Sequence, residues 1–204
     1  MEVTHFKKAS TDADTRDTLS RMERDWDARA REAPEQYIAS AHRQWRMDEF
    51  FQSGQINVDN YILADAEVIC RGKKLSQMRV LEIGCGAGRM TRALAASFGE
   101  VHAVDISTEM IALAKRNLSD LRNVFLHKNN GIDLSEFPDQ SLDFAFSFIV
   151  FQHIPSLIII AMQMERRDPP WWPRRSSRVF PLGNHKMVAH FAEHRSRQRR
   201  GNRG

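Results

Sequence analysis

Hydrophobic residues in the first third of the chain recur at three- and four-residue steps. One stripe runs from Leu19 to Ala30, and a second begins at Tyr37. Such spacing puts apolar side chains on one face of a helix, so it predicts consecutive helices. We expect Gly54 to end one of them and a further helix to occupy residues 57–72.

From residue 79 onward the pattern changes, because short apolar runs alternate with helical segments. Strands are expected at residues 79–83, 101–104, 123–127 and 142–149, and helices at residues 89–98 and 107–118. Strands joined through helices of this length require right-handed crossovers and pair in parallel. The pattern therefore predicts an α/β fold with a doubly wound parallel sheet.

The chain divides into three parts at changes in pattern and charge. Residues 1–75 form a helical cap, residues 76–156 form the sheet core, and nothing after Ser156 alternates like a strand. Residues 157–204 hold 11 Lys and Arg against 3 Asp and Glu, a net charge of +8, whereas the rest of the chain carries −4. We expect an acidic folded body and an irregular basic tail.

Composition excludes several classes of protein. Hydrophobic residues make up 42% and charged residues 27%, which is typical of a globular chain rather than a disordered or fibrous one. Two cysteines cannot build a disulfide framework, and the chain opens with no secretory signal, so we expect a cytoplasmic protein. The apolar stretch 144–162 is interrupted by polar residues and Pro155, so we expect no membrane span.

A glycine-rich turn follows the first expected strand. Gly84, Gly86 and Gly88 lie between that strand and the next helix. Glycines allow a positive-φ turn and let a ligand lie against bare backbone, while the N–H groups at the helix start attract negative ligand atoms. Taken alone, the turn equally fits a tight connection that binds nothing.

Asp105 narrows the choice of ligand. It closes the second strand 21 residues after Gly84, where a carboxylate can accept both hydroxyls of a ribose. The alternative role is a cap for the helix that begins near Ser107. That alternative leaves the coincidence with the glycine turn unexplained, so an adenosine-type ligand is favoured.

The charge of Glu82 distinguishes between adenosine ligands. A carboxylate two residues before the first glycine would repel the pyrophosphate of NAD. S-adenosylmethionine has no phosphate, and its ammonium would be attracted to Glu82, directly or through water. Its carboxylate would meet the N–H groups of the turn, so this ligand fits better.

Residues 80–88 together with Asp105 resemble the class I S-adenosylmethionine-dependent methyltransferases, which implies a Rossmann-like core under an N-terminal helical lid. The likeness covers about residues 26–155. It implies that the glycine turn, Cys85 included, holds the methionine part, that Asp105 holds the ribose, and that Phe148 lies against the methionine. It further implies adenine contacts from Ile106, Met110, Asn130, Gly131 and Ile132.

On the substrate side, the resemblance implies a small-molecule methyl acceptor near Gln152 and His153. His153 is a candidate base, although a histidine before Ile154 and Pro155 also fits a role in positioning the loop. Trp26 and Tyr37 fall in the region that resembles the lid, although an aromatic residue at helical spacing is more often a core residue than a ligand contact.

The resemblance also implies three further strands, which the sequence after Ser156 does not provide. We therefore expect an incomplete sheet that ends in an uncovered strand, and methyl transfer that is impaired or lost, leaving a cofactor-binding remnant. The rival hypothesis is that a helix at residues 157–165 and the tail cover this edge and complete a minimal enzyme.

The residues of the tail suggest two other functions. Its arginines could bind nucleic acid, as in an RNA methyltransferase, although a charge run is more often simply solvated. His190 and His194 formally fit the zinc motif H-x-x-E-H on a helix, but no third ligand follows them. We therefore expect no metal site.

Overall fold

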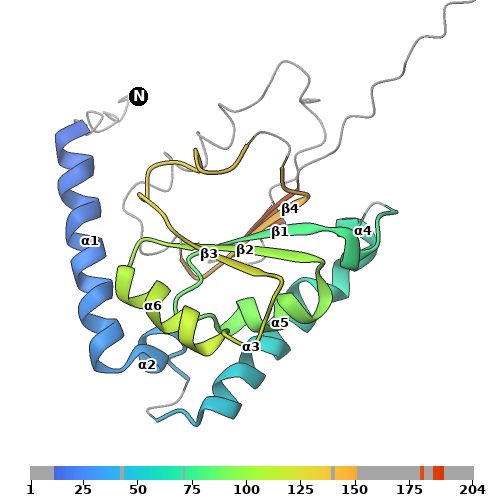
Figure 1. Ribbon diagram of the computed structural model, residues 1–204, viewed down its shortest axis with the longest axis horizontal. Helices are drawn as coiled ribbons and strands as arrows, with labels where there is room; N and C mark the ends of the chain where they lie inside the picture. Colours follow the sequence, from blue (N-terminus) through green and yellow to red (C-terminus); the bar gives the residue numbers. More distant parts are fainter. Residues whose placement is uncertain are drawn as a thin grey trace, which may run out of the picture.

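The computed structural model describes residues 12–41, 44–70, 72–138, 141–150, 180–181 and 186–190. Its centre is a sheet of four parallel strands in the order β3-β2-β1-β4 (Figure 1). The strands are β1 (Arg79–Ile83), β2 (Glu100–Asp105), β3 (Val124–Lys128) and β4 (Phe144–Phe148). The predicted Rossmann-like α/β fold is confirmed.

Helices precede the sheet and connect its strands. They are α1 (Asp12–Glu32), α2 (Pro34–Ile38), α3 (Met47–Tyr61), α4 (Ala66–Cys70), α5 (Arg89–Ser97) and α6 (Thr108–Asn117), with short 3-10 turns at Leu63–Asp65 and Leu75–Gln77. Helices α3, α5 and α6 lie on the same side of the sheet (Figure 1). No helix in the described ranges is long and apolar enough to cross a membrane.

The main core lies between the sheet and this helical layer. Val80, Val101 and Phe144 of the strands pack with Leu94 of α5 and Val58 of α3, and all five are completely buried. On the opposite side of the sheet, Leu81, Val104 and Ala145 pack against residues of the β3–β4 connection. The period-two alternation of each strand thus supplies apolar side chains to both faces.

Gly54 does not end a helix, so that prediction is wrong. It lies buried in the middle of α3, whose helical hydrogen bonding continues to Tyr61. A Cβ atom at this position would lie 2.2 Å from the carbonyl oxygen of Arg89. The glycine lets α3 and the start of α5 pack backbone to backbone, and this packing outweighs its low helix propensity.

Two strands follow the parallel sheet, so the expectation of an entirely irregular tail is also wrong. β6 (Lys186–His190) pairs antiparallel with β4, and β5 (Phe180–Pro181) pairs with β6. The edge of β4 is therefore covered rather than open. Strand pairing uses main-chain groups that almost any residue supplies, and so the sequence pattern gave little sign of it. The expected helix at residues 157–165 lies outside the described residues.

Candidate cofactor site

A cavity opens at the carboxyl ends of the parallel strands, next to β1. The strand order changes direction there, because β2 and β3 lie on one side of β1 and β4 lies on the other. It encloses about 820 Å³, including the part that is open to solvent. Crevices at this point of a parallel sheet are where such folds bind ligands. The cavity is lined by Met22, Trp26, Tyr37, Ile38, Ile83, Gly84, Gly86, Val104, Asp105, Ile106, Asn129, Gly131, Phe148, Ile149 and Val150.

The glycine turn forms the floor of this cavity, and its conformation explains the three glycines. Gly84, Gly86 and Gly88 have φ values of 78°, 53° and 87°, which residues with a side chain rarely adopt. A Cβ atom would lie 2.2 Å from the Val150 side chain at Gly84 and 2.9 Å from Ile38 at Gly86. The turn therefore requires glycine both for its backbone angles and for close approach.

Hydrogen bonds hold the turn to the end of β2. The N–H groups of Gly84 and Cys85 both donate to the carbonyl oxygen of Val104, at 2.8 and 3.0 Å. The N–H of Gly86 donates to Oδ2 of Asp105 at 2.9 Å. These three N–H groups are thus engaged within the protein. The N–H of Gly88 is likewise engaged, because it donates to the carbonyl oxygen of Cys85 at 3.0 Å.

Asp105 lies at the end of β2, on the wall of the cavity. Its Oδ1 accepts the N–H of Ser107 at 2.8 Å, so each carboxylate oxygen holds one backbone donor. Burial raises the pKa of Asp105, and the hydrogen bonds from Ser107 and Gly86 oppose that shift. The backbone of Ile106 opposes the shift as well, and because a carboxylate has about four acceptor positions, Asp105 retains capacity for a further donor. The cap of α6 is Ser107 rather than Asp105.

Glu82 lies beneath the glycine turn and is almost completely buried, with 4% of its surface exposed. Its Oε2 accepts the hydroxyl of Thr91 at 2.6 Å, and it is not among the residues that line the cavity. Burial raises the pKa of Glu82 to about 7, while the Thr91 bond and the charge of Arg89 act in the opposite direction. Near neutral pH, small changes in pH or in nearby charge therefore change how far Glu82 is ionised.

Arg89 forms a buried polar support that the sequence analysis missed. Its Nη1 donates to Oγ of Ser53 at 3.1 Å, and the Asn57 amide, with its oxygen turned toward the guanidinium, accepts at 2.9 Å. The guanidinium also lies over the Phe148 ring, 5.7 Å from its centroid, and Tyr61 stacks on the same ring. A signal was present, since Ser53 and Asn57 are four residues apart on one helix.

The loop after β3 brings a second backbone surface to the cavity. Asn129 and Gly131 line it, and the N–H of Gly131 donates to Oδ1 of Asn129 at 2.6 Å. Asn130 turns the other way, because its Oδ1 accepts the N–H groups of Ile132 and Asp133 at 2.7 and 3.0 Å. Asn130 therefore builds the loop, and Asn129 is the asparagine at the cavity.

The cavity wall opposite the sheet comes from α1 and α2. Met22 and Trp26 of α1 and Tyr37 and Ile38 of α2 line it, and Arg29 lies over both aromatic rings, 4.7 Å from the Trp26 centroid and 5.5 Å from the Tyr37 centroid. These two aromatic residues therefore face the cavity.

The backbone of β4 becomes strained where it reaches the cavity. Ile149 has a φ of 63°, which is unusual for a β-branched residue. Strained residues of this kind cluster at functional sites, where the surrounding structure holds them in place. Ile149 also lines the cavity, so the strain lies in the wall of the candidate site.

The structure brings six of the predicted site residues to the cavity and leaves six away from its lining. Those at the cavity are Gly84, Gly86, Asp105, Ile106, Gly131 and Phe148. Those away from its lining are Glu82, Cys85, Gly88, Met110, Asn130 and Ile132. Met110 is fully buried within the fold, because α6 turns it inward. His153 lies outside the described residues.

The described ranges hold no cluster of three or more His, Cys, Asp or Glu side chains that could bind a metal ion. His190 ends strand β6 rather than lying on a helix, and His194 is not among the described residues.

A parallel sheet with a glycine turn at its switch point and an acid closing the next strand defines a Rossmann-like protein that binds an adenosine-type ligand. Residues 80–166 match the sequence profile of a family described as "Methyltransferase domain". Residues 80–166 thus form a methyltransferase domain of the class I S-adenosylmethionine-dependent type.

Individual relatives agree with this assignment. The chain is 38% identical over 64 residues to a demethylmenaquinone methyltransferase of Tropheryma whipplei, a match that covers 31% of this chain and 26% of that protein. The matched part therefore spans about a quarter of the relative's length.

Solved structures share the fold. Phosphoethanolamine N-methyltransferase 1 of Haemonchus contortus, in complex with phosphoethanolamine and S-adenosylhomocysteine, aligns with a TM-score of 0.54 at 16% identity, covering 80% of this chain and 32% of that one. Magnesium protoporphyrin IX methyltransferase of Synechocystis, with bound S-adenosylmethionine, aligns with a TM-score of 0.51 at 18% identity, covering 75% and 69%.

Proposed function

We propose that this chain catalyses methyl transfer from S-adenosylmethionine to a small molecule. One observation carries the proposal: Asp105 and the glycine turn line the same cavity, and the N–H of Gly86 donates to the Asp105 carboxylate. This arrangement leaves acceptor capacity on Asp105 for a ribose hydroxyl. The family of the domain supplies the choice of cofactor.

The residues present fit this cofactor. The glycine floor leaves room that any Cβ would fill, and the acid on the wall stands beside a mainly apolar surface that suits an adenine ring. When bound, S-adenosylmethionine supplies an activated methyl group on a sulfonium. The protein has to orient the acceptor and exclude water. Orienting the acceptor requires no strong base.

Specific residues would perform these tasks. Ile106 and Gly131 would flank the adenine, and Phe148, braced by Arg89 and Tyr61, would form the wall beside the methionine part. Glu82, with its pKa near 7, would respond to a nearby ammonium by losing its proton. Trp26 and Tyr37 would exclude water from the opposite side.

A small-molecule acceptor is supported by the enclosure of the cavity. Side chains from α1 and α2 cover the side of the cavity opposite the sheet, which limits the size of a group that can enter. The two solved relatives named above are methyltransferases of phosphoethanolamine and of magnesium protoporphyrin IX. His153 remains the candidate base on the acceptor side.

The test is a transfer assay with methyl-labelled cofactor against a panel of small metabolites, including amines, phenols and carboxylates. We expect label in at least one product over multiple turnovers. Absence of label with every acceptor, while S-adenosylhomocysteine still binds, would instead support the cofactor-binding remnant. Label appearing only in added RNA would favour the nucleic-acid hypothesis.

A further inference from the structure

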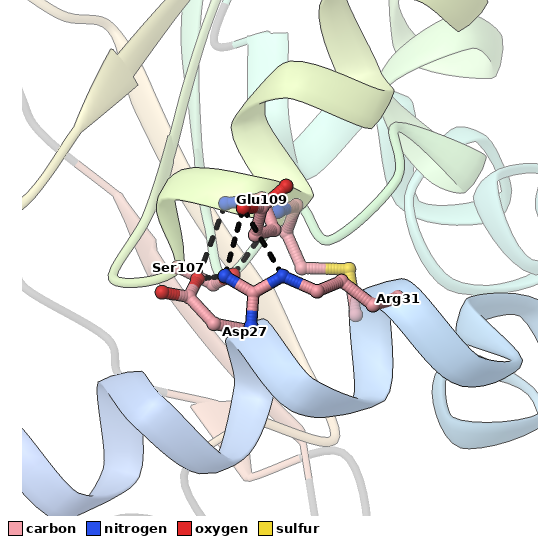
Figure 2. Close-up of polar contacts among 5 residues, drawn as sticks. Asp27, Arg31, Ser107 and Glu109 are labelled. Carbon is pink, nitrogen blue, oxygen red and sulfur yellow. Dashed lines mark hydrogen bonds and ion pairs between the residues drawn. The ribbon is translucent and has the colours of Figure 1, made fainter.

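Helix α1 is joined to the beginning of α6 by a polar cluster that crosses 80 residues of sequence. Oδ1 of Asp27 accepts the Ser107 hydroxyl at 2.6 Å and the N–H of Glu109 at 3.1 Å. Figure 2 shows Asp27 and Arg31 on α1 facing Ser107 and Glu109 at the first turn of α6. The lid helix therefore contributes to the cap of a helix in the core.

The same cluster continues to the candidate cofactor site. Ser107 is fully buried and caps α6, because its Oγ accepts the N–H of Met110 at 3.0 Å. Its own N–H donates to Asp105, which also accepts the N–H of Gly86. An unbroken series of hydrogen bonds thus leads from Asp27 on the lid, through Ser107 and Asp105, to the glycine turn.

Electrostatics make Asp27 the principal member of this contact. The first turn of a helix presents free N–H groups and a partial positive charge, so a carboxylate from another element is stabilised there. The neighbouring ion pair of Arg31 and Glu109, at 2.8 Å, has side chains that are 62% and 40% exposed. Solvent screens such a pair, and it contributes little.

The position of Asp27 also connects it to the cavity wall. The preceding residue, Trp26, lines the cavity, and Met22 lines it one helical turn earlier. Holding Asp27 against α6 therefore holds both side chains over the space that the cofactor would occupy.

We infer that Asp27 is a positioning residue that latches α1 over the cofactor site and, through Ser107, fixes the orientation of the Asp105 carboxylate. The inference rests on the proposed function, because it assigns Asp27 a role in retaining the cofactor. Loss of the Asp27 carboxylate frees α1 to open and lets a bound ligand leave faster. The aligned Asp105 acceptors also become less well ordered.

Two measurements on the full chain test this latch. The first is amide hydrogen exchange of residues 16–32 without ligand, and the second is the dissociation rate of S-adenosylhomocysteine. For Asp27→Ala we expect the exchange rate of α1 and the dissociation rate of S-adenosylhomocysteine to rise roughly tenfold, because hydrogen bonds to a charged acceptor are lost. Asp27→Asn keeps an acceptor oxygen for Ser107 and should recover part of the loss.

Asp17→Ala is the matched control, because it removes an exposed carboxylate from the same helix, and the ion-pair partner of this carboxylate is Arg21 of α1. It should change neither measurement. Unchanged exchange of α1 in Asp27→Ala would overturn the latch. Faster exchange with unchanged ligand dissociation would overturn its role in retaining the cofactor.

These outcomes separate the inference from the proposed function. Exchange of β1 and β2 reports whether Asp27→Ala is folded. If the unaltered chain binds no S-adenosylhomocysteine, the proposed function fails, while exchange of α1 in the ligand-free protein still decides whether the latch exists.

Discussion

Glu82 places a titratable carboxyl where water cannot solvate its charge. Because burial raises its pKa from 4.5 to about 7, the folded protein holds this proton over a pH range in which the unfolded chain has lost it. The stability contributed is full below pH 4.5 and is lost as pH rises through 7. The loss amounts to about 3 kcal/mol in total at 1.36 kcal/mol per pH unit, as an order of magnitude.

This residue gives a direct prediction for stability against pH. Between pH 5 and 8 the free energy of unfolding should fall in the native protein, and Glu82→Gln should fall less steeply and be the more stable of the two at pH 8. Urea unfolding at several pH values measures both. Glu67→Gln, an exposed glutamate on α4, is the control and should follow the native curve. Parallel curves for Glu82→Gln and native protein would show that Glu82 is ionised throughout.

At the scale of elements, the packing of α3 on α5 reverses an ordinary rule of helix propensity. Alanine is better than glycine in a helix by about 1 kcal/mol, yet a Cβ at Gly54 would lie 2.2 Å from the Arg89 carbonyl oxygen. Overpacking of this kind costs about 1 to 3 kcal/mol. Gly54→Ala should therefore destabilise the protein, and it should weaken cofactor binding because Arg89 supports Phe148.

Chemical denaturation of Gly54→Ala beside Gln52→Ala, an exposed position on the same helix, measures this effect. The control should change stability by less than about 0.5 kcal/mol. A stabilised Gly54→Ala would mean that α3 and α5 are further apart than the structure has them.

The elements themselves also show how far sequence reasoning reaches. The four parallel strands and helices α5 and α6 were predictable, because local hydrophobic periodicity and the glycine turn define them. Gly54 was misread because the reason for that glycine lies on α5, 35 residues away. The contribution of Asp27 to the cap of α6 and the support that Arg89 gives to Phe148 were missed for the same reason. Each depends on two distant segments meeting, which periodicity does not encode.

At the scale of the whole molecule, β6 closes the edge that the sequence left open. Val188 pairs with Phe146 on one side and with Phe180 on the other, so it lies in the interior of the sheet. Proline there removes a ladder hydrogen bond, and prolines are found essentially only on edge strands or at bulges. Val188→Pro should speed amide exchange of residues 144–148 and weaken ligand binding, because Phe148 lines the cavity.

Val188→Thr keeps both the N–H and a β-branched side chain, so it is the matched control and should exchange like the native chain. Native-like exchange of β4 in Val188→Pro would show that β6 does not cover this edge. The uncovered edge strand expected from the sequence would then apply. The basic segment 157–204 lies mostly outside the described residues, and its nucleic-acid hypothesis stays a prediction.

The central claim is that the glycine turn and Asp105 form a site for S-adenosylmethionine rather than for a dinucleotide. Isothermal titration of the full chain with S-adenosylhomocysteine, beside NADH, tests it most directly. We predict binding of S-adenosylhomocysteine, no binding of NADH, and a loss of about 1.5 to 3 kcal/mol in Asp105→Ala. Asp120→Ala, which removes an exposed ion pair with Arg92, should bind like the native chain. Binding of NADH without S-adenosylhomocysteine would contradict the claim.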